Sequence, residues 1–249
     1  MLTQYRLMLE ADRECAPSQE WAYRMYASLL NALPDSFAKG LHENEMTPIS
    51  QFLTCGEDRC VWTVNLLGDY CEKVVAPILE EKQSYSVGNH HKANQAEMLV
   101  LAGEKESIKD VEELLALAVN DSASHKLSFQ TATAFKSQGS YINLPTNRLI
   151  LNNLVKKWNG CISNCPIEIE NGALEALSGE LNCTHFSLHD CSYNLKGNTI
   201  GGFAGEMIFE NRANGFHREI LNALLYFSDY SGIGIKTTLG MGGVIHESI

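Results

Sequence analysis

The sequence predicts an α+β protein made of two tandem ferredoxin-like (RRM-like) domains, each with an antiparallel sheet that has its helices on one face. Two observations predict this fold. The order β-α-β-β-α-β occurs twice along the chain, without visible sequence repetition, and a short acidic segment at 104–121 separates the two copies. We therefore divide the chain into an N-terminal domain with a linker helix, 1–121, and a C-terminal domain, 122–249.

Hydrophobic periodicity predicts the elements of the first domain. The segment 3–11 alternates Tyr5, Leu7 and Leu9 with polar residues, which indicates a strand. Hydrophobic residues recur every four positions over 18–33, which indicates an amphipathic helix. The remaining predicted elements are strands at 48–55 and 60–67, a helix at about 69–81 and a strand within 83–101.

The second domain repeats the same order. Its predicted elements are a strand at 125–135, a helix at 146–159, strands at 183–195 and 199–210, a helix at 215–229 and a last strand at 239–248.

The charge is unevenly distributed. The formal net charge is −11, which argues against broad nonspecific binding to nucleic acid. The first domain carries 10 basic and 20 acidic residues, and the second carries 9 and 10. A polyanionic partner should therefore prefer the second domain. The sequence contains no leader segment and no apolar run of membrane-spanning length, so we expect a cytoplasmic protein without membrane contact.

The eight cysteines are expected to be reduced thiols in that compartment. Their spacings do not repeat the C-x2-C pair that is typical of zinc ribbons. We predict neither a metal site nor a cofactor.

The glycine-rich segment GIGIKTTLGMGG, residues 232–243, is the most distinctive motif. It fits neither the P-loop nor the dinucleotide-binding pattern, because the required glycines are missing and the segment leads into a strand rather than a helix. Its backbone amides could form an anion-binding nest, and we expect it to bind the phosphate backbone of a nucleic-acid strand. A purely structural turn explains the glycines equally well. The predicted contact residues are Gly232, Gly234, Lys236, Thr237, Thr238, Gly240 and Gly242.

The two glycine pairs give the sequence a resemblance to a known family. A G-x-G pair followed after five residues by a second G-x-G is similar to the C-terminal signature of the RAMP superfamily, and in particular of the CRISPR repeat-processing endoribonucleases. Three further stretches resemble members of that family: LHENEMTPIS at 41–50, the strand and helix at 127–159, and GGFAGEMIFE at 201–210. The resemblance therefore extends over nearly the whole chain.

The resemblance implies an activity. Members cleave the repeats of a CRISPR precursor transcript without a metal ion. The ribose 2′-hydroxyl attacks the adjacent phosphate and the 5′-oxygen leaves, which gives a 2′,3′-cyclic phosphate. Such a reaction needs a base, an acid and donors for the charge on the phosphate. The implied partners are CRISPR repeat RNA and the mature guide RNA.

The resemblance also suggests catalytic residues. His42 lies where many members carry a catalytic histidine, and the neighbouring Glu43 could orient its ring. Tyr26, and also Tyr23, lie on the preceding helix and could direct a hydroxyl at the same site.

The sequence departs from the family pattern at one point. Members often carry a lysine five or six residues after the histidine, and here those positions hold Thr47 and Pro48. A non-catalytic RAMP subunit that holds guide RNA in a CRISPR effector complex is therefore an alternative to the enzyme. A third interpretation is a regulatory or scaffold protein without RNA. Whether the chain acts alone, as a homodimer or with effector subunits stays open.

Overall fold

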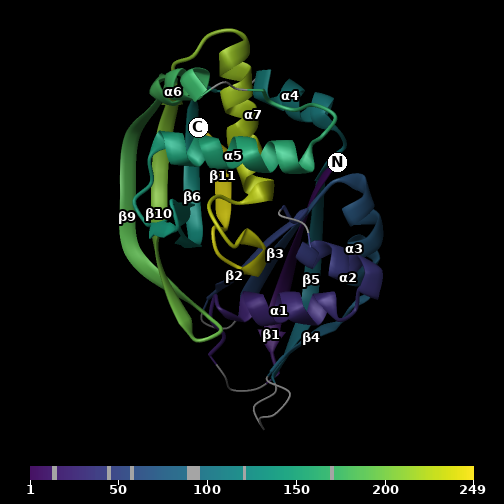
Figure 1. Cartoon of the computed structure of the whole chain (residues 1–249). Coiled ribbons are helices and arrows are strands. Elements are labelled where there is room, and N and C mark those ends of the chain that lie inside the picture. Colours follow the sequence, from purple (N-terminus) through teal and green to yellow (C-terminus); the bar gives the residue numbers. More distant parts are fainter. Residues whose placement is uncertain (13–15, 44–45, 57–58, 89–95, 120–121, 169–170) are drawn as a thin grey trace.

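The computed structural model describes residues 1–12, 16–43, 46–56, 59–88, 96–119, 122–168 and 171–249, and the side chains of residues 42, 43 and 171 also lie outside that description. Two antiparallel sheets form the frame of the molecule (Figure 1), which confirms the predicted fold class.

The first sheet has the strand order β2-β3-β1-β5-β4. Its central strands β1 and β3 pair antiparallel, with Leu2 opposite Leu67. The helices of this part of the chain lie in front of the sheet in Figure 1. The elements are β1 (Leu2–Ala11), α1 (Trp21–Leu30), α2 (Asp35–Glu43), β2 (Ile49–Cys55), β3 (Cys60–Leu67), α3 (Asp69–Glu81), β4 (Ser84–Val87) and β5 (Ala96–Ile108).

The second sheet has the order β11-β6-β10-β9. Its first strand, β6, is central and pairs with its last strand, β11, at the edge, as in a ferredoxin-like domain. A small hairpin, β7-β8, is inserted after β6. The elements are α4 (Val111–Val119), β6 (Ser124–Thr133), β7 (Phe135–Ser137), β8 (Ser140–Ile142), α5 (Asn147–Cys161), α6 (Asn171–Glu180), β9 (Leu181–Leu195), β10 (Asn198–Asn211), α7 (Phe216–Ser231), the 3-10 turn η1 (Thr237–Leu239) and β11 (Val244–Ser248).

Both faces of strand β1 are buried in its first half, and beyond Tyr5 the face opposite the helices becomes exposed. Tyr5, Leu7 and Leu9 pack in the core beneath the helices of the first domain. Leu2 belongs to the core of the second domain, and Gln4 is 2% exposed and donates to the carbonyl of Asp229 in α7. Alternate residues of a strand point to opposite faces. The polar face predicted by the alternation is therefore the interface between the domains.

Helix α7 joins the two domains. It contacts β10 and β11 of its own sheet and also β1, β2 and β3 of the first sheet. The carbonyl groups of its last turn accept hydrogen bonds from the first domain, because Asn65 donates to Asp229 and Ser50 donates to Tyr230. These carbonyls have no partner within a helix, so side chains from the other domain satisfy them.

The structure corrects two details of the first domain. The strand predicted within 83–101 is a pair, β4 and β5, and β5 continues to Ile108 into the segment expected to be the linker. The linker helix itself is present as α4. A helix that the periodicity did not predict, α2, lies between α1 and β2 and contains the start of the segment 41–50.

Two further expectations were wrong. A disulfide joins Cys55 and Cys60 across the β2-β3 hairpin, whereas all cysteines were expected to be reduced. The two residues are directly opposite in the hairpin, which brings their sulfur atoms together. The last strand was predicted from residue 239 but begins at Val244, after η1.

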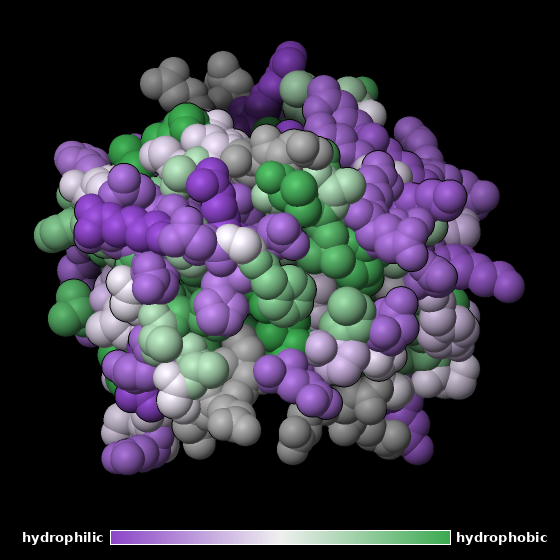
Figure 2. Space-filling view, turned by 90° about the horizontal axis from the view of Figure 1, so that it is seen from above, coloured by the Kyte–Doolittle hydropathy of each residue, from purple (hydrophilic) through white to green (hydrophobic). Residues whose placement is uncertain are grey.

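The surface is mixed in character. Figure 2 shows the end of the molecule that is uppermost in Figure 1, where hydrophilic residues cover most of the surface and hydrophobic residues are exposed in small groups between them. Among the described residues, no helix has both the length and the apolar character needed to cross a membrane.

Candidate active site at the glycine-rich loop

The glycine-rich loop, residues 232–243, connects α7 to β11 and lies beside α1 and β2 of the first domain (Figure 1). All four glycines of its two G-x-G pairs adopt positive φ angles, which glycine reaches without a Cβ penalty. The angles are 63° at Gly232, 87° at Gly234, 102° at Gly240 and 66° at Gly242. The path of the loop therefore depends on these glycines.

The glycines also allow close packing of the loop against β6. A Cβ atom added at Gly234 would overlap the carbonyl oxygen of Ala134. The amide of Gly234 donates to Oδ1 of Asn153 at 2.7 Å, and the amide of Gly242 donates to the carbonyl of Ala132 at 3.1 Å. The structure corrects the expectation that these two amides face a phosphate, because both are bonded within the protein.

The donors that remain lie between the glycine pairs. Lys236 has a left-handed backbone with φ of 56° and leads into η1. The amides of Lys236, Thr237 and Thr238 donate to no acceptor among the described residues. The Thr238 hydroxyl is engaged, because it donates to the carbonyl of Ile49 at 3.0 Å. Three amides and the Lys236 ammonium group are thus the available donors.

Side chains of helix α5 hold the loop by hydrogen bonds. Besides accepting from the amide of Gly234, Asn153 donates to the carbonyl of that glycine at 3.3 Å. One turn later, the buried Lys157 ammonium donates to the carbonyls of Ser231 at 2.9 Å and Gly232 at 3.0 Å, and to the Thr237 hydroxyl at 3.2 Å. Burial lowers the pKa of Lys157 to about 7, and the neighbouring Cys161 thiol opposes this shift.

A cavity of about 490 Å³ opens between this loop and the first domain. One wall is formed in the first domain by Tyr26 of α1 and by Leu41, Met46 and Thr47. The other wall is formed by one side of α5, including Asn153, and by the loop itself. Three lysines line it, namely Lys156, Lys157 and Lys236, and none of its described lining residues is an aspartate or a glutamate. Lys156 and Lys236 form no ion pair with the described residues. In a chain of net charge −11, Lys156 and Lys236 make this cavity a local concentration of positive charge, whereas the buried Lys157 is only partly charged near neutral pH.

The two tyrosines of α1, Tyr26 and Tyr23, line different hollows of the molecule. Tyr26 is 4% exposed and lines the cavity, and its hydroxyl has no hydrogen bond to the described residues. Burial raises the pKa of Tyr26 well above its usual value, and Cys71 adds to the shift. Its hydroxyl is therefore protonated at neutral pH and can act as a donor. Tyr23 lines a different groove, where the Lys196 ammonium lies 5.1 Å from the centre of its ring.

His42 lies in the last turn of α2, and its side chain is outside the described part of the structure. Three described residues next to it in sequence, Leu41, Met46 and Thr47, line the cavity. The backbone position of His42 is thus at the wall of the cavity, and its catalytic role stays a prediction.

The sequence analysis did not single out Asn153, Lys156 or Lys157. They belong to a helix that was predicted correctly, and their spacing of three and four residues is the signal that places them on one face of it. Only the packing of α5 beneath the loop shows that this face contacts the glycines.

Comparison with known proteins agrees with this geometry. The sequence profile of the family described as CRISPR-associated endoribonuclease Cas6 matches residues 127–244, which include α5 and the glycine-rich loop. A CRISPR-associated endoribonuclease Cas6 of Streptococcus thermophilus is 29% identical over 96% of this chain and 96% of its own length.

The chain is similar to members of the Cas6 family.

Solved structures show the same fold. A Cas6 product complex superposes with a TM-score of 0.79 at 24% identity, covering 99% of both chains. A structure described as a RAMP protein binding different RNA substrates has a TM-score of 0.65 at 12% identity and covers 99% of this chain and 100% of that chain. The predicted resemblance to the Cas6 endoribonucleases and the ferredoxin-like architecture are confirmed.

Proposed function

We propose that this chain is an endoribonuclease that cleaves CRISPR repeat RNA, and that the cut occurs in the cavity between the end of α2 and the glycine-rich loop. One observation carries the proposal: in an acidic protein, the unpaired Lys156 and Lys236 and no carboxylate line this cavity among the described residues. Phosphate groups are the natural ligands of such a site. The similarity to named Cas6 endoribonucleases supports the same activity.

The proposed mechanism uses general acid-base catalysis without a metal ion. A base takes the proton of the ribose 2′-hydroxyl, whose oxygen bonds to the adjacent phosphorus. The bond from phosphorus to the 5′-oxygen breaks, and that oxygen takes up a proton. The products are a 2′,3′-cyclic phosphate and a 5′-hydroxyl. His42 is assigned to proton transfer, because imidazole titrates near neutral pH, and the protonated Tyr26 hydroxyl is assigned as a hydrogen-bond donor.

Charge on the phosphate needs stabilisation as the pentacoordinate state forms. We assign this role to the Lys236 ammonium and to the amides of Lys236, Thr237 and Thr238. The family's usual lysine is absent at Thr47 and Pro48, but Lys156 and Lys236 reach the same cavity from the second domain. A source of positive charge is therefore available, which favours the enzyme over a non-catalytic RNA-binding subunit.

The test is cleavage of labelled repeat RNA from the CRISPR array of the same genome, in excess EDTA. We expect a 5′-hydroxyl fragment and a fragment that ends in a 2′,3′-cyclic phosphate. Activity that disappears in EDTA and returns with magnesium, or a 3′-hydroxyl end, would contradict the mechanism. Tight binding without any cleavage would instead favour the non-catalytic subunit.

A further inference from the structure

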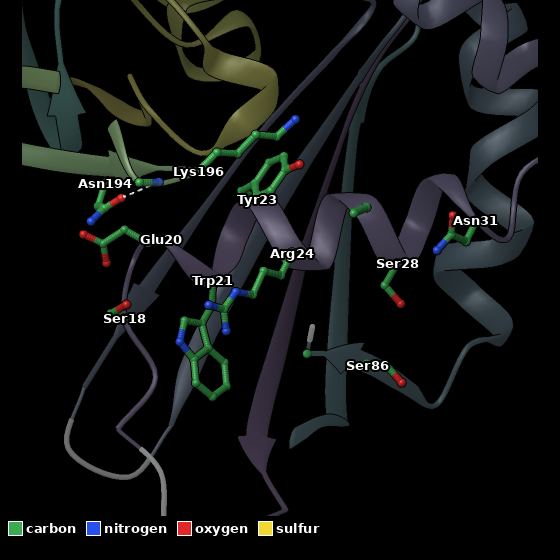
Figure 3. A pocket seen from close by; sticks show the side chains of 13 residues that line it. Ser18, Glu20, Trp21, Tyr23, Arg24, Ser28, Asn31, Ser86, Asn194 and Lys196 are labelled. Atoms are coloured by element: carbon green, nitrogen blue, oxygen red, sulfur yellow. Dashed lines mark hydrogen bonds between the residues drawn. The ribbon is translucent and has the colours of Figure 1, made fainter. Parts of the chain in front are cut away.

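A second hollow lies on the other side of α1, with a volume of about 890 Å³ (Figure 3). Its floor is the exposed side of α1, and its ends are formed by the end of β4 and by the tip of the β9-β10 hairpin. We call it the α1 groove and define it by Trp21, Tyr23, Arg24, Ser86, Asn194 and Lys196. Its volume is near the upper end of the roughly 300–1,000 Å³ that is typical of ligand sites, so it has room for more than a single base.

The side chains of the α1 groove combine aromatic rings with cations. The Lys196 ammonium lies over the Tyr23 ring, at 5.1 Å from its centre. In Figure 3, Trp21 and Arg24 extend together from the opposite side of α1. Both aromatic residues are only half-buried, while Arg24 and Lys196 are exposed. Faces of rings are therefore accessible to a ligand.

The tip of the hairpin has a defined conformation. Lys196 has a positive φ of 53°, followed by Gly197 at 82°. The amide of Gly197 donates to Oδ1 of Asn194 at 3.1 Å, which closes the turn (Figure 3). Behind the turn, the Tyr193 hydroxyl donates to the carbonyl of Leu239 at 2.7 Å. The Lys196 ammonium is thus presented from a turn that is fixed to the glycine-rich loop.

The α1 groove and the catalytic cavity meet at one contact. Leu239 lines the cavity and packs in the same hydrophobic cluster as Tyr23, which lines the groove. Tyr26, one turn along α1, faces the cavity. An RNA strand whose phosphate occupies the cavity therefore has a polar, aromatic and cationic surface directly beyond Leu239.

Aromatic faces and flexible cations are the chemistry that binds single-stranded RNA, because exposed bases stack on rings while lysine and arginine contact the phosphates. Among the described lining residues, Glu20 is the one carboxylate. We propose that the α1 groove binds unpaired nucleotides that adjoin the cleaved phosphate on the same RNA strand. This proposal rests on the proposed function for the position of the cut, and it assigns binding rather than chemistry to the groove.

The test measures binding of uncleavable repeat RNA, with a 2′-deoxyribose at the cut. One probe retains the unpaired nucleotides on both sides of the cut, and shorter probes lack them on one side or the other. The variants are Tyr23→Ala, Arg24→Ala and Lys196→Asn, since asparagine tolerates the left-handed backbone of residue 196. Tyr70→Ala and Lys73→Ala on α3 are matched controls, because both residues are exposed.

We expect wild type to lose affinity when the unpaired nucleotides are removed from one side. Tyr23→Ala should weaken binding of the full probe about 5- to 30-fold, as expected for one lost stacking contact, and should leave binding of the shortened probe unchanged. A 2-aminopurine base in the unpaired segment should be quenched on binding by wild type and not by Tyr23→Ala. The control variants should match wild type.

Three results would overturn the proposal: equal affinity of wild type for all probes, equal loss by Tyr23→Ala on full and shortened probes, or losses of the same size in the controls. Because binding is measured without cleavage, the two proposals separate. If the protein binds the unpaired nucleotides but fails to cut repeat RNA, the proposal for the groove holds and the proposed endoribonuclease activity is wrong. If the protein cuts repeat RNA and binds it equally well with and without the unpaired nucleotides, the proposed activity holds and the proposal for the groove is wrong.

Discussion

Lys157 shows how one buried side chain connects stability and site geometry. Its ammonium group has three acceptors, the carbonyls of Ser231 and Gly232 and the hydroxyl of Thr237. Two of these acceptors are the orphaned carbonyls at the end of α7. Lys157 therefore fixes the point at which the helix ends and the glycine-rich loop begins.

The lowered pKa of Lys157 gives a prediction about pH. The folded protein releases the proton at about pH 7, whereas the unfolded chain retains it up to about 10.5. Between these values the unfolded state binds more protons, so stability increases as pH rises. From pH 7 to 8.5, the free energy of unfolding of wild type should rise relative to Lys157→Met by about 1 kcal/mol per pH unit.

Urea unfolding of both proteins at several pH values measures this difference. Taking the difference between the two proteins removes the titration of groups that both contain, such as Cys161 and Asp229, whose pKa values burial raises to about 11 and about 6. Parallel curves for wild type and Lys157→Met would mean that the three acceptors keep the ammonium charged.

His42 carries the catalytic prediction at the scale of a single residue. His42→Ala should reduce the single-turnover cleavage rate by roughly 10²- to 10⁴-fold and leave RNA affinity nearly unchanged, because phosphate contacts elsewhere supply the binding. His217→Ala, on the exposed start of α7, is the matched control. A rate for His42→Ala within a few-fold of wild type would remove this residue from the mechanism.

The glycine-rich loop combines two functions that the sequence presents as alternatives. Its glycines pack against β6, as a structural turn requires, and the segment between them carries the unpaired amides and Lys236. The close packing arises from residues a hundred or more positions away in the sequence, such as Ala132 and Ala134. The motif alone therefore could not divide its residues between these functions.

Two substitutions in the loop should behave differently. Gly234→Val places a side chain at positive φ against the carbonyl of Ala134, and should cost at least about 2 kcal/mol and lower the thermal midpoint by roughly 5 °C or more. Lys236→Ala should leave the midpoint unchanged, weaken binding of many RNA sequences alike and reduce the slope of log K against log salt by about 0.7.

Thermal unfolding and salt titrations of RNA binding check these two outcomes. Gly179→Ala is the control for the glycine, since a Cβ there meets no atom within 4 Å. A Gly234→Val protein of normal stability that fails to bind RNA would mean that the glycine serves phosphate contact after all. If Lys236→Ala leaves both the RNA affinity and the slope of log K against log salt unchanged, the loop is a structural turn and does not bind phosphate.

At the scale of the whole molecule, the two domains share their packing. Leu2, Leu67 and Ile108 of the first domain belong to the core cluster of the second. Buried polar residues of the first sheet bind the last carbonyls of α7. The cavity beside the glycine-rich loop is lined from both domains, so its geometry depends on both.

We expect the two domains to unfold in one transition, and Ser50→Ala to destabilise both together. Ser50 donates to the carbonyl of Tyr230 at 2.5 Å and accepts from Asn65 at 2.9 Å, so its loss takes the donor from a buried carbonyl and leaves the Asn65 amide with Asp229 as its remaining acceptor. The expected cost is about 1–3 kcal/mol. Urea unfolding followed by domain-specific hydrogen exchange measures it, with the exposed Ser140→Ala as control. Two separate transitions would contradict this prediction.

The sequence by itself determined the doubled β-α-β-β-α-β order, the approximate limits of most elements and the glycine-rich loop. These features depend on local periodicity and on glycine spacing, which are legible along the chain. The same is true of the hydrophobic side of β1, where Tyr5, Leu7 and Leu9 alternate with polar residues and form the core that the alternation predicts.

Only the tertiary structure decided what the polar side of that strand does and which residues surround the cavity. Gln4 is a polar residue of an alternating strand, so its sequence context resembles a solvated face, yet the end of α7 buries it. Likewise, the sequence around Lys156 and Lys157 indicates only a helix. The packing of α5 against the loop is what places both lysines at the cavity. Burial and convergence of this kind arise from contacts between distant segments, and local sequence carries no record of them.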